Sequence, residues 1–550
     1  MSRTRQGTTA QDAGPLDAVV VGAGFAGLYM LHRLRGLGLS ARAFEAGKDV
    51  GGTWYWNRYP GARCDVESMQ YSFSFSEALQ QEWRWTERFA GQPEILAYAN
   101  HVADRFDLRR DIQFGTRVTA ASFDEAARLW RIETDRGDRV SAAFCIMATG
   151  CLSAGRVPDI SGMAEFRGRS FHTGQWPHEG VDFTGQRVGV IGTGSSAIQS
   201  IPVIAEQAEH VYVFQRTPNF SVPARNGPMT PEYEQEWKSS YAERRLRARR
   251  LRSGVLYNFG ETSALAVSAE EREREYQARW EGGGISLMSA YTDLALSKEA
   301  NDTAADFVRR QIRATVRDPA VAETLLPTSH PIGTKRICAD TGYYETFNRP
   351  NVTLVDLRAS PITRITPGGI ATRDTEYAVD SIVYATGFDA MTGSLLRANI
   401  SGRGGMPLAQ KWAEGPRSYL GLMTAGFPNL FTITGPGSPS VLSNMIVSIE
   451  QHVDWIADCL SFLRAHGIAC MEATPDAEEA WVAHGNEVAH RTLYPQANSW
   501  YMGANIEGKP RVFMPYIGGV GAYRDTCDAV AAKGYEGFRL TRRTQAAAAE

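Results

Sequence analysis

Near the N-terminus, a short run of apolar, β-branched residues leads into a stretch in which leucines recur at helical spacing. The apolar run spans residues 18–21 and ends in a glycine-rich turn at residues 22–27. Such a run is typical of a buried parallel strand, and the leucine spacing predicts a helix after the turn. These leucines are Leu28, Leu31, Leu34 and Leu37. A second short strand at residues 41–45 completes a strand–helix–strand unit.

The same order of elements recurs further along the chain. An apolar strand at residues 187–191 runs into a second glycine-rich turn, and a helix and another strand follow up to residue 216. Two more apolar strands, at residues 144–150 and 382–389, both contain Ala-Thr-Gly near their ends. We expect the chain to cross between two domains at these small-residue ends. The pattern predicts an α/β protein with two Rossmann-like dinucleotide-binding domains and a helical insertion in the second.

The predicted insertion is charged and helix-forming. It contains a basic stretch at residues 244–252 and an acidic, mixed stretch at residues 270–275. Because opposite charges follow closely and no aromatic residues interleave, we expect both stretches to be solvated faces rather than anion-binding surfaces. The predicted ranges are residues 1–152 and 386–550 for the first domain, 153–222 and 328–385 for the second, and 223–327 for the insertion.

Composition narrows the class of protein. The 550 residues carry a net charge of −3, which gives no overall basic field for nucleic acid or an anionic membrane. Seven cysteines without a close C-x-x-C pair argue against a disulfide framework and a metal site. No apolar run approaches the length of a membrane span. We expect a cytoplasmic enzyme with small-molecule partners, and with no nucleic-acid, membrane or metal partner.

The two glycine turns predict two different dinucleotides. Gly22, Gly24 and Gly27 form one turn, and Gly192 and Gly194 the other. In such a turn the glycines permit a tight bend and a close approach to a pyrophosphate at the helix N-terminus.

The residue that ends the second strand of each unit distinguishes the cofactors. Glu45 can accept hydrogen bonds from a ribose hydroxyl, which suits FAD in the first domain. Arg216 suits the 2′-phosphate of NADPH in the second domain. A plain surface charge at a strand end is the competing interpretation of Arg216. Disulfide reductases of this architecture carry a cysteine pair after the first acidic strand, where this chain has Gly-Gly-Thr-Trp-Tyr-Trp at residues 51–56. Dithiol chemistry is therefore not expected.

A motif between the domains resembles the fingerprint F-x-G-x-x-x-H-x-x-x-W-P of the type I Baeyer–Villiger monooxygenases. Its residues are Phe166, Gly168, His172 and Trp176. N- and S-oxygenating flavin monooxygenases usually have another aromatic residue at the position of Trp176. The similarity extends over nearly the whole chain and is greatest to the phenylacetone and steroid monooxygenase branch. The resemblance implies an enzyme that uses FAD, NADPH and O2 to insert one oxygen atom beside a ketone carbonyl through a C4a-peroxyflavin.

The resemblance also implies roles for individual residues. Arg336 would stabilise the negatively charged oxygen species, and Asp65 would pair with it. Lys335 would join Arg216 and Thr217 at the 2′-phosphate, and Trp500 would cover the nicotinamide half. His172 and Trp176 would belong to the linker that couples domain movement to catalysis.

The remaining implied contacts fall into three groups. Those to FAD are Ala26, Thr53, Trp54, Asp65, Tyr71 and Met445. Those to NADP are Thr193, Ser195, Ser196, Gln199 and Arg336. Those to the substrate are Ser440, Val441, Leu442 and Ser443.

Residue type alone leaves alternative roles open for these positions. A loop arginine such as Arg336 is often a surface residue, Asp65 could cap a loop, and Trp500 could be packed core. The chain could also be an N- or S-oxygenating flavin monooxygenase, or an NADPH:flavin redox partner that does not oxygenate. Aromatic, steroid-type and cyclic ketones all suit the branch, and the absence of a sustained heptad pattern leaves a monomer or weak oligomer.

Overall fold

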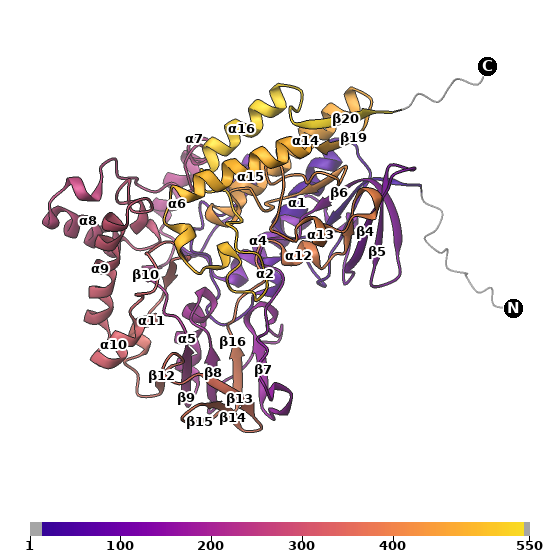
Figure 1. Cartoon of the computed structure of the whole chain (residues 1–550). Coiled ribbons are helices and arrows are strands. Elements are labelled where there is room, and N and C mark those ends of the chain that lie inside the picture. Colours follow the sequence, from indigo (N-terminus) through magenta and orange to yellow (C-terminus); the bar gives the residue numbers. More distant parts are fainter. Residues whose placement is uncertain (1–13, 544–550) are drawn as a thin grey trace, which may run out of the picture.

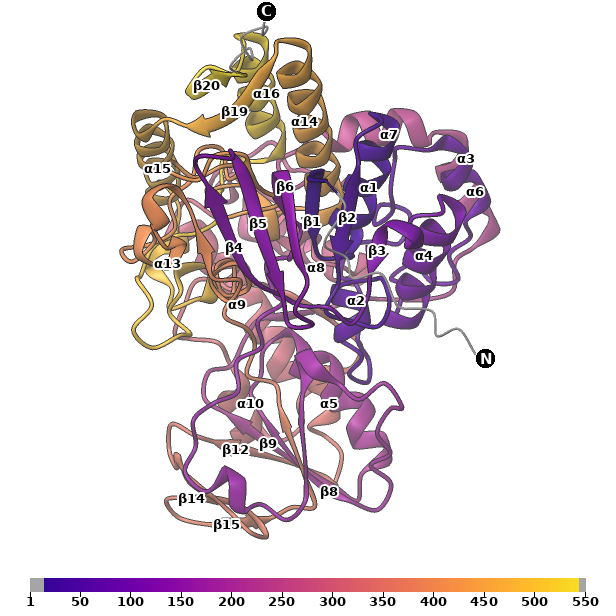
Figure 2. The same cartoon turned by 90° about the vertical axis from the view of Figure 1, so that its right-hand side faces the viewer.

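The computed structural model describes residues 14–543 and arranges them in two lobes, each built on a mainly parallel sheet (Figures 1 and 2). The outer ends of the predicted first domain, residues 1–13 and 544–550, lie outside the described residues. This arrangement confirms the predicted α/β class.

The first lobe is organised around an eight-stranded sheet in the order β17-β4-β5-β6-β1-β2-β3, with β18 beside β6. In β1 the last four residues are buried, as expected for a parallel strand covered on both faces. The strand β1 lies between β2 and β6 in parallel register, whereas β4, β5 and β6 are antiparallel. The bounds are β1 Leu16–Val21, β2 Ala41–Phe44, β3 Ile112–Gln113, β4 Val118–Asp124, β5 Leu129–Thr134, β6 Arg139–Met147, β17 Ile400–Ser401 and β18 Leu430–Thr432.

Helices from both ends of the chain cover this sheet. Helix α1 (Phe25–Gly36) follows the first glycine turn and packs against the long helix α14 (Met445–Ala465). A two-stranded antiparallel ribbon of β19 and β20 lies near the C-terminus (Figure 1). The other bounds are α2 Thr53–Trp56, α3 Glu77–Glu82, α4 Gln92–Arg105, α12 Gly393–Leu396, α13 Leu408–Lys411, α15 Pro475–His490, α16 Val520–Ala532, β19 Ile468–Ala473 and β20 Phe538–Arg542.

The second lobe holds a five-stranded parallel sheet in the order β12-β9-β8-β16-β7. Helix α5 (Ser195–Gln207) packs on β8 and β9, which gives the second strand–helix–strand unit. The strands of this lobe are β7 Arg169–His172, β8 Arg187–Ile191, β9 His210–Gln215, β12 Val352–Asp356 and β16 Ser381–Tyr384, with the small sheet β13 Ile362–Thr366, β14 Gly369–Thr372 and β15 Glu376–Ala378.

Two chain crossings between the lobes lie side by side. The crossing after β6 and the crossing after β16 meet where Gly155 and Phe388 form an isolated antiparallel bridge. Figure 2 shows these segments in the narrow region between the lobes. Each crossing follows one of the two Ala-Thr-Gly strand ends.

The helical insertion contacts both lobes. Its first helices, α6 (Pro231–Ser239) and α7 (Tyr241–Ala248), bury Trp237 and Tyr241 in the core of the first lobe. Its later helices, α8 (Ala269–Gly282), α9 (Lys298–Thr315) and α10 (Pro319–Leu325), contribute to the core of the second lobe. Short strands β10 (Ser221–Pro223) and β11 (Cys338–Asp340) and helix α11 (Tyr343–Thr346) flank the insertion.

The expectation that the basic stretch is a solvated face is wrong at Arg245. This side chain is buried, and its guanidinium donates to the carbonyl oxygens of Met69 and Gln70 and to the hydroxyl of Ser72. Arg245 thus attaches α7 to the first lobe. Its burial is tolerated because the three acceptors replace the water that the guanidinium loses.

Two negative findings apply to residues 14–543. None of their helices has the length and apolar character needed to cross a membrane. Nor do they bring three or more histidine, cysteine or acidic side chains together in a way that could hold a metal ion.

Candidate functional site

The first glycine turn is sterically committed to glycine. Gly22 has a φ of 106°, and a Cβ there would lie 2.6 Å from the carbonyl oxygen of Ala148. A Cβ on Gly27 would lie 2.0 Å from the carbonyl oxygen of Gly22. Helix α1 begins after Gly24 without a side-chain cap, so its first N–H groups are free to bind an anion. The turn therefore fits a dinucleotide pyrophosphate.

Glu45 is buried behind this turn. Its Oε2 accepts a hydrogen bond of 2.8 Å from the N–H of Ala23, and its Oε1 accepts one of 2.7 Å from the N–H of Gly47. Burial raises the pKa of Glu45 despite these bonds. The carboxylate thus braces the glycine turn and keeps further acceptor capacity, which the predicted ribose contact requires.

The second glycine turn repeats the first. Gly192 has a φ of 115°, and a Cβ there would lie 2.4 Å from the carbonyl oxygen of Ala385. A Cβ on Gly194 would meet nothing within 4 Å, so the space above this residue is open. Helix α5 also begins without a side-chain cap. Thr193 donates to the carbonyl oxygen of Thr217 at 2.8 Å, which ties the turn to the end of β9.

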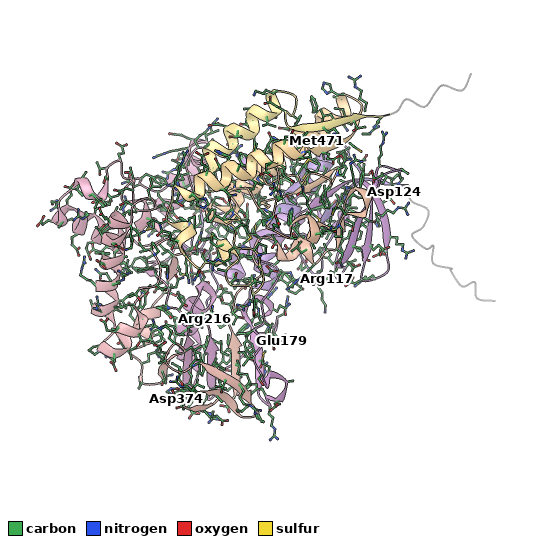
Figure 3. The ribbon with its side chains drawn as sticks, viewed as in Figure 1. Arg117, Asp124, Glu179, Arg216, Asp374 and Met471 are labelled. Carbon is green, nitrogen blue, oxygen red and sulfur yellow. The ribbon has the colours of Figure 1, made fainter. Side chains whose placement is uncertain are left out.

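Three cations gather near the end of β9. Arg216 is exposed there (Figure 3). Burial, together with Arg216, lowers the pKa of Lys335. Burial and the same arginine lower the pKa of Arg156, which sequence analysis did not single out. Among residues 14–543 none of the three forms a salt bridge. Mutually repelling cations of this kind fit a multiply charged anion such as a 2′-phosphate.

Arg336 and Asp65 form a forked ion pair. The Nη2 of Arg336 lies 2.7 Å from Oδ1 and 2.8 Å from Oδ2 of Asp65, and its Nε lies 3.1 Å from Oδ2. A further bond of 3.2 Å runs from Nη1 to the carbonyl oxygen of Val441. Burial opposes the charged guanidinium, but Asp65, together with Tyr501 and Tyr257, raises the pKa of Arg336 above its ordinary value. The site therefore holds a fixed positive charge.

The predicted substrate segment lies directly against this pair. Ser440 has a φ of 42°, a left-handed conformation that is uncommon for a residue with a side chain. Its hydroxyl lies 2.9 Å from the Sγ of Cys151. The next residues, Val441 and Leu442, belong to an apolar cluster with Tyr501 and its neighbours in the segment 494–514. Ser443 bonds to Ser448 at 2.6 Å, and Met445 begins α14.

The predicted aromatic contacts line the same region. Trp500 is half-buried, and its ring centroid lies 4.1 Å from that of Tyr501. The Nε1 of Trp54 donates to the hydroxyl of Tyr71 at 3.2 Å. Thr53 is exposed at the start of α2, whereas Ala26 is buried in α1.

The fingerprint residues hold the crossings between the lobes. His172 accepts from the N–H of Gly174 at 3.0 Å through Nδ1, and its Nε2 lies 3.2 Å from the carbonyl oxygen of Arg156. Trp176 is buried against Phe171, with ring centroids 5.4 Å apart. A Cβ on Gly168 would lie 2.3 Å from the carbonyl oxygen of Asp380, beside Phe166. These residues stabilise the linker between the lobes and place no charged group beside Arg336.

A contact between the lobes was missed by sequence analysis. Tyr59 donates to the Oε1 of Gln199 at 2.8 Å, and the Nε2 of Gln199 donates to the carbonyl oxygen of Arg63 at 3.1 Å. Gln199 therefore anchors α5 to the first lobe. A lone tyrosine such as Tyr59 in a loop gives no sequence signal that it will have such a partner.

The two serines at the start of α5 also make hydrogen-bond contacts. Ser195 accepts from the thiol of Cys338 at 3.0 Å, and the hydroxyl of Ser196 lies 3.1 Å from the hydroxyl of Thr173.

Comparisons with known proteins place this site in context. Residues 19–252 match the family described as pyridine nucleotide-disulphide oxidoreductase. All seven cysteines of the chain are free and buried. A Baeyer–Villiger monooxygenase from Pseudooceanicola batsensis is 44% identical over 94% of this chain and 95% of its own length.

Two solved structures share the fold over nearly the whole chain. A steroid monooxygenase bound to NADP is 55% identical, with a TM-score of 0.93 over 96% of this chain and 100% of that one. OTEMO in complex with FAD and NADP is 43% identical, also with a TM-score of 0.93, over 96% of this chain and 99% of that one.

Proposed function

This chain belongs to the Baeyer–Villiger monooxygenases, and we propose that its forked Arg336–Asp65 pair is the group that makes ketone oxygenation possible here. The enzyme is a monooxygenase that uses FAD and NADPH to convert a ketone into an ester or lactone. The observation that carries the residue assignment is the guanidinium held by three bonds to Asp65 beside the predicted substrate segment.

The two glycine turns would hold the cofactors, with the FAD pyrophosphate at α1 and the NADP pyrophosphate at α5. When bound, FAD reduced by NADPH supplies the electrons that activate O2. Arg216, Lys335 and Arg156 would bind the 2′-phosphate, and Trp500 would shield the reaction region from water.

Arg336 performs the electrostatic part of catalysis in this proposal. Negative charge develops on the carbonyl oxygen of the ketone as the new carbon–oxygen bond forms. The pKa of a guanidinium lies far above neutral pH, so Arg336 keeps its positive charge throughout the reaction. Asp65 fixes the plane of the guanidinium, so no reorganisation is needed in the transition state. Asp65 is thus a positioning residue, and Arg336 a catalytic one.

We further propose apolar ketones of aromatic, steroid-type or cyclic structure as substrates. The apolar residues around Val441 and Tyr501 support this class. A cytoplasmic location is supported by the seven free cysteines and by dependence on NADPH. We propose a monomer or weak oligomer as the working form.

Reaction under 18O2 with a panel of ketones, an amine and a sulfide tests the proposed function. One labelled oxygen atom in an ester or lactone is the expected result. Label only in an amine oxide or sulfoxide, or NADPH oxidation that yields hydrogen peroxide with every substrate, would contradict it.

A further inference from the structure

Tyr257 has a buried hydroxyl group that no described residue satisfies. Its oxygen is shielded from solvent and has no hydrogen-bond partner among residues 14–543. A buried hydroxyl without a partner is costly, and native proteins leave few of them unmatched. Tyr257 follows α7 in the part of the insertion that docks on the first lobe.

Both charged members of the proposed site act on this hydroxyl, as does the neighbouring carboxylate of Glu67. Burial raises the pKa of Tyr257, Asp65 raises it further, and Arg336 opposes the shift. The phenol therefore keeps its proton at neutral pH. Asp65 accepts three bonds from Arg336, and Arg336 has only donors; the phenol makes no hydrogen bond to either residue.

Hydrogen bonds connect the segment that contains Tyr257 to the end of the predicted substrate segment. The N–H of Leu256 donates to the Oε1 of Gln70 at 2.7 Å, and the Nδ2 of Asn444 donates to the carbonyl oxygen of Gln70 at 2.8 Å. The N–H of Asn444 also donates to the carbonyl oxygen of Ser253 at 2.8 Å. The segment 253–257 and the start of α14 thus share one hydrogen-bonded framework.

Tyr257 and Asp65 line one cavity of about 350 Å3. Its lining combines the apolar residues Phe89, Leu256 and Ile285 with charged side chains, namely Glu67, Arg88, Glu275 and Arg279. Apart from Asp65, the lining contains none of the residues predicted to bind FAD or NADP, so neither cofactor track accounts for it. Tyr257 also borders a hollow beside α7 whose lining includes Arg244 and Arg247 but none of the predicted site residues.

We propose that the Tyr257 hydroxyl donates a hydrogen bond to the carbonyl oxygen of the ketone, which enters through this cavity and reaches Arg336. This inference rests on the proposed function, because the acceptor it assigns to the Tyr257 hydroxyl is the carbonyl oxygen of the ketone. Arg336 and Tyr257 together give the ketone carbonyl oxygen two hydrogen-bond donors, the first charged and the second neutral. Tyr257 is thereby a catalytic residue in contact with substrate.

The test compares Tyr257→Phe with wild type in the FAD-loaded enzyme. We expect the KM of the ketone and its dissociation constant for the oxidised, NADP+-bound enzyme to rise about tenfold. The dissociation constant is measured from the change in flavin absorbance. The affinity for NADP+ and the rate of flavin reduction by NADPH should stay unchanged, which a general loss of structure would not allow.

Tyr241→Phe is the matched control. That phenol lies in the same docked segment but contacts the sulfur of Met69. We expect this variant to keep wild-type ketone affinity, and equal thermal midpoints of both variants would show intact folding. Unchanged ketone KM and dissociation constant in Tyr257→Phe, or a loss confined to NADP+ affinity, would overturn the inference. Failure of the wild-type enzyme to form an ester or lactone would instead overturn the proposed function.

Discussion

The Nη2 atom of Arg336 lies 2.7 Å from the Oδ1 of Asp65, across 271 residues of sequence. Asp65 lies in a loop of the first lobe, whereas Arg336 lies two residues before β11, beyond the end of the insertion. The pair therefore joins segments that come from opposite sides of the lobe junction. About a quarter of each side chain is accessible, at 27% for Arg336 and 22% for Asp65.

Replacing Asp65 with alanine should destabilise the FAD-loaded enzyme. The change leaves a largely buried guanidinium without its carboxylate, and we expect a loss of about 2 kcal/mol, between the values typical of exposed and buried pairs. The free energy of unfolding in urea measures it. Asp525→Ala is the control, because its pair with Arg250 is mostly exposed. A loss no larger than that of the control would show that the forked pair contributes nothing to stability.

Gly22→Ala should reduce FAD content. The added Cβ would collide with the carbonyl oxygen of Ala148 and would need a φ that alanine disfavours. The ratio of flavin to protein absorbance after purification gives the readout. Gly36→Ala is the control at the other end of α1, where a Cβ meets nothing within 4 Å. Full FAD content in Gly22→Ala would show that this turn does not cradle the cofactor.

The preference for NADPH over NADH should decrease as the pH rises. Burial and Arg216 lower the pKa of Lys335, so this lysine loses its charge at a lower pH than an ordinary lysine. The charged form binds the 2′-phosphate, and affinity for NADPH is therefore lost as the pH rises through that pKa. Dissociation constants of both nucleotides between about pH 7 and 10 provide the measurement.

Lys335→Arg serves as the control for this pH dependence, because an arginine does not titrate in that range. Its preference for NADPH should stay level across the same interval. A wild-type preference that is equally level would exclude Lys335 from the 2′-phosphate site.

The sequence pattern predicts those parts of the fold in which residues close together in the sequence decide the structure. Both glycine turns follow a strand and precede a helix. Only glycine suits Gly22 and Gly192, because a Cβ at either position would collide with a backbone carbonyl oxygen. Glu45 was predictable as an acid at a strand end, although its burial and its bonds to the turn were not. The pairing of Arg336 with Asp65 was predicted from the family resemblance at their own motifs, and not from residue spacing.

What the sequence could not reveal depends on docking between distant segments. A run of arginines along α7 does not show that Arg245 faces the first lobe, because the acceptors are backbone carbonyls of residues 69 and 70. The same holds for Tyr257 and for the bond between Tyr59 and Gln199. Each of these tyrosines sits in a loop without a repeating pattern, and its surroundings exist only in the folded chain.

The ratio of ester formed to NADPH oxidised in Arg336→Ala tests the central claim most directly. The fixed positive charge is what favours oxygen transfer to the ketone, so its loss should lower this ratio about a hundredfold while NADPH oxidation continues and releases hydrogen peroxide. Arg310→Ala, which removes an exposed arginine paired with Glu273, should keep the wild-type ratio. A wild-type ratio in Arg336→Ala would contradict the account.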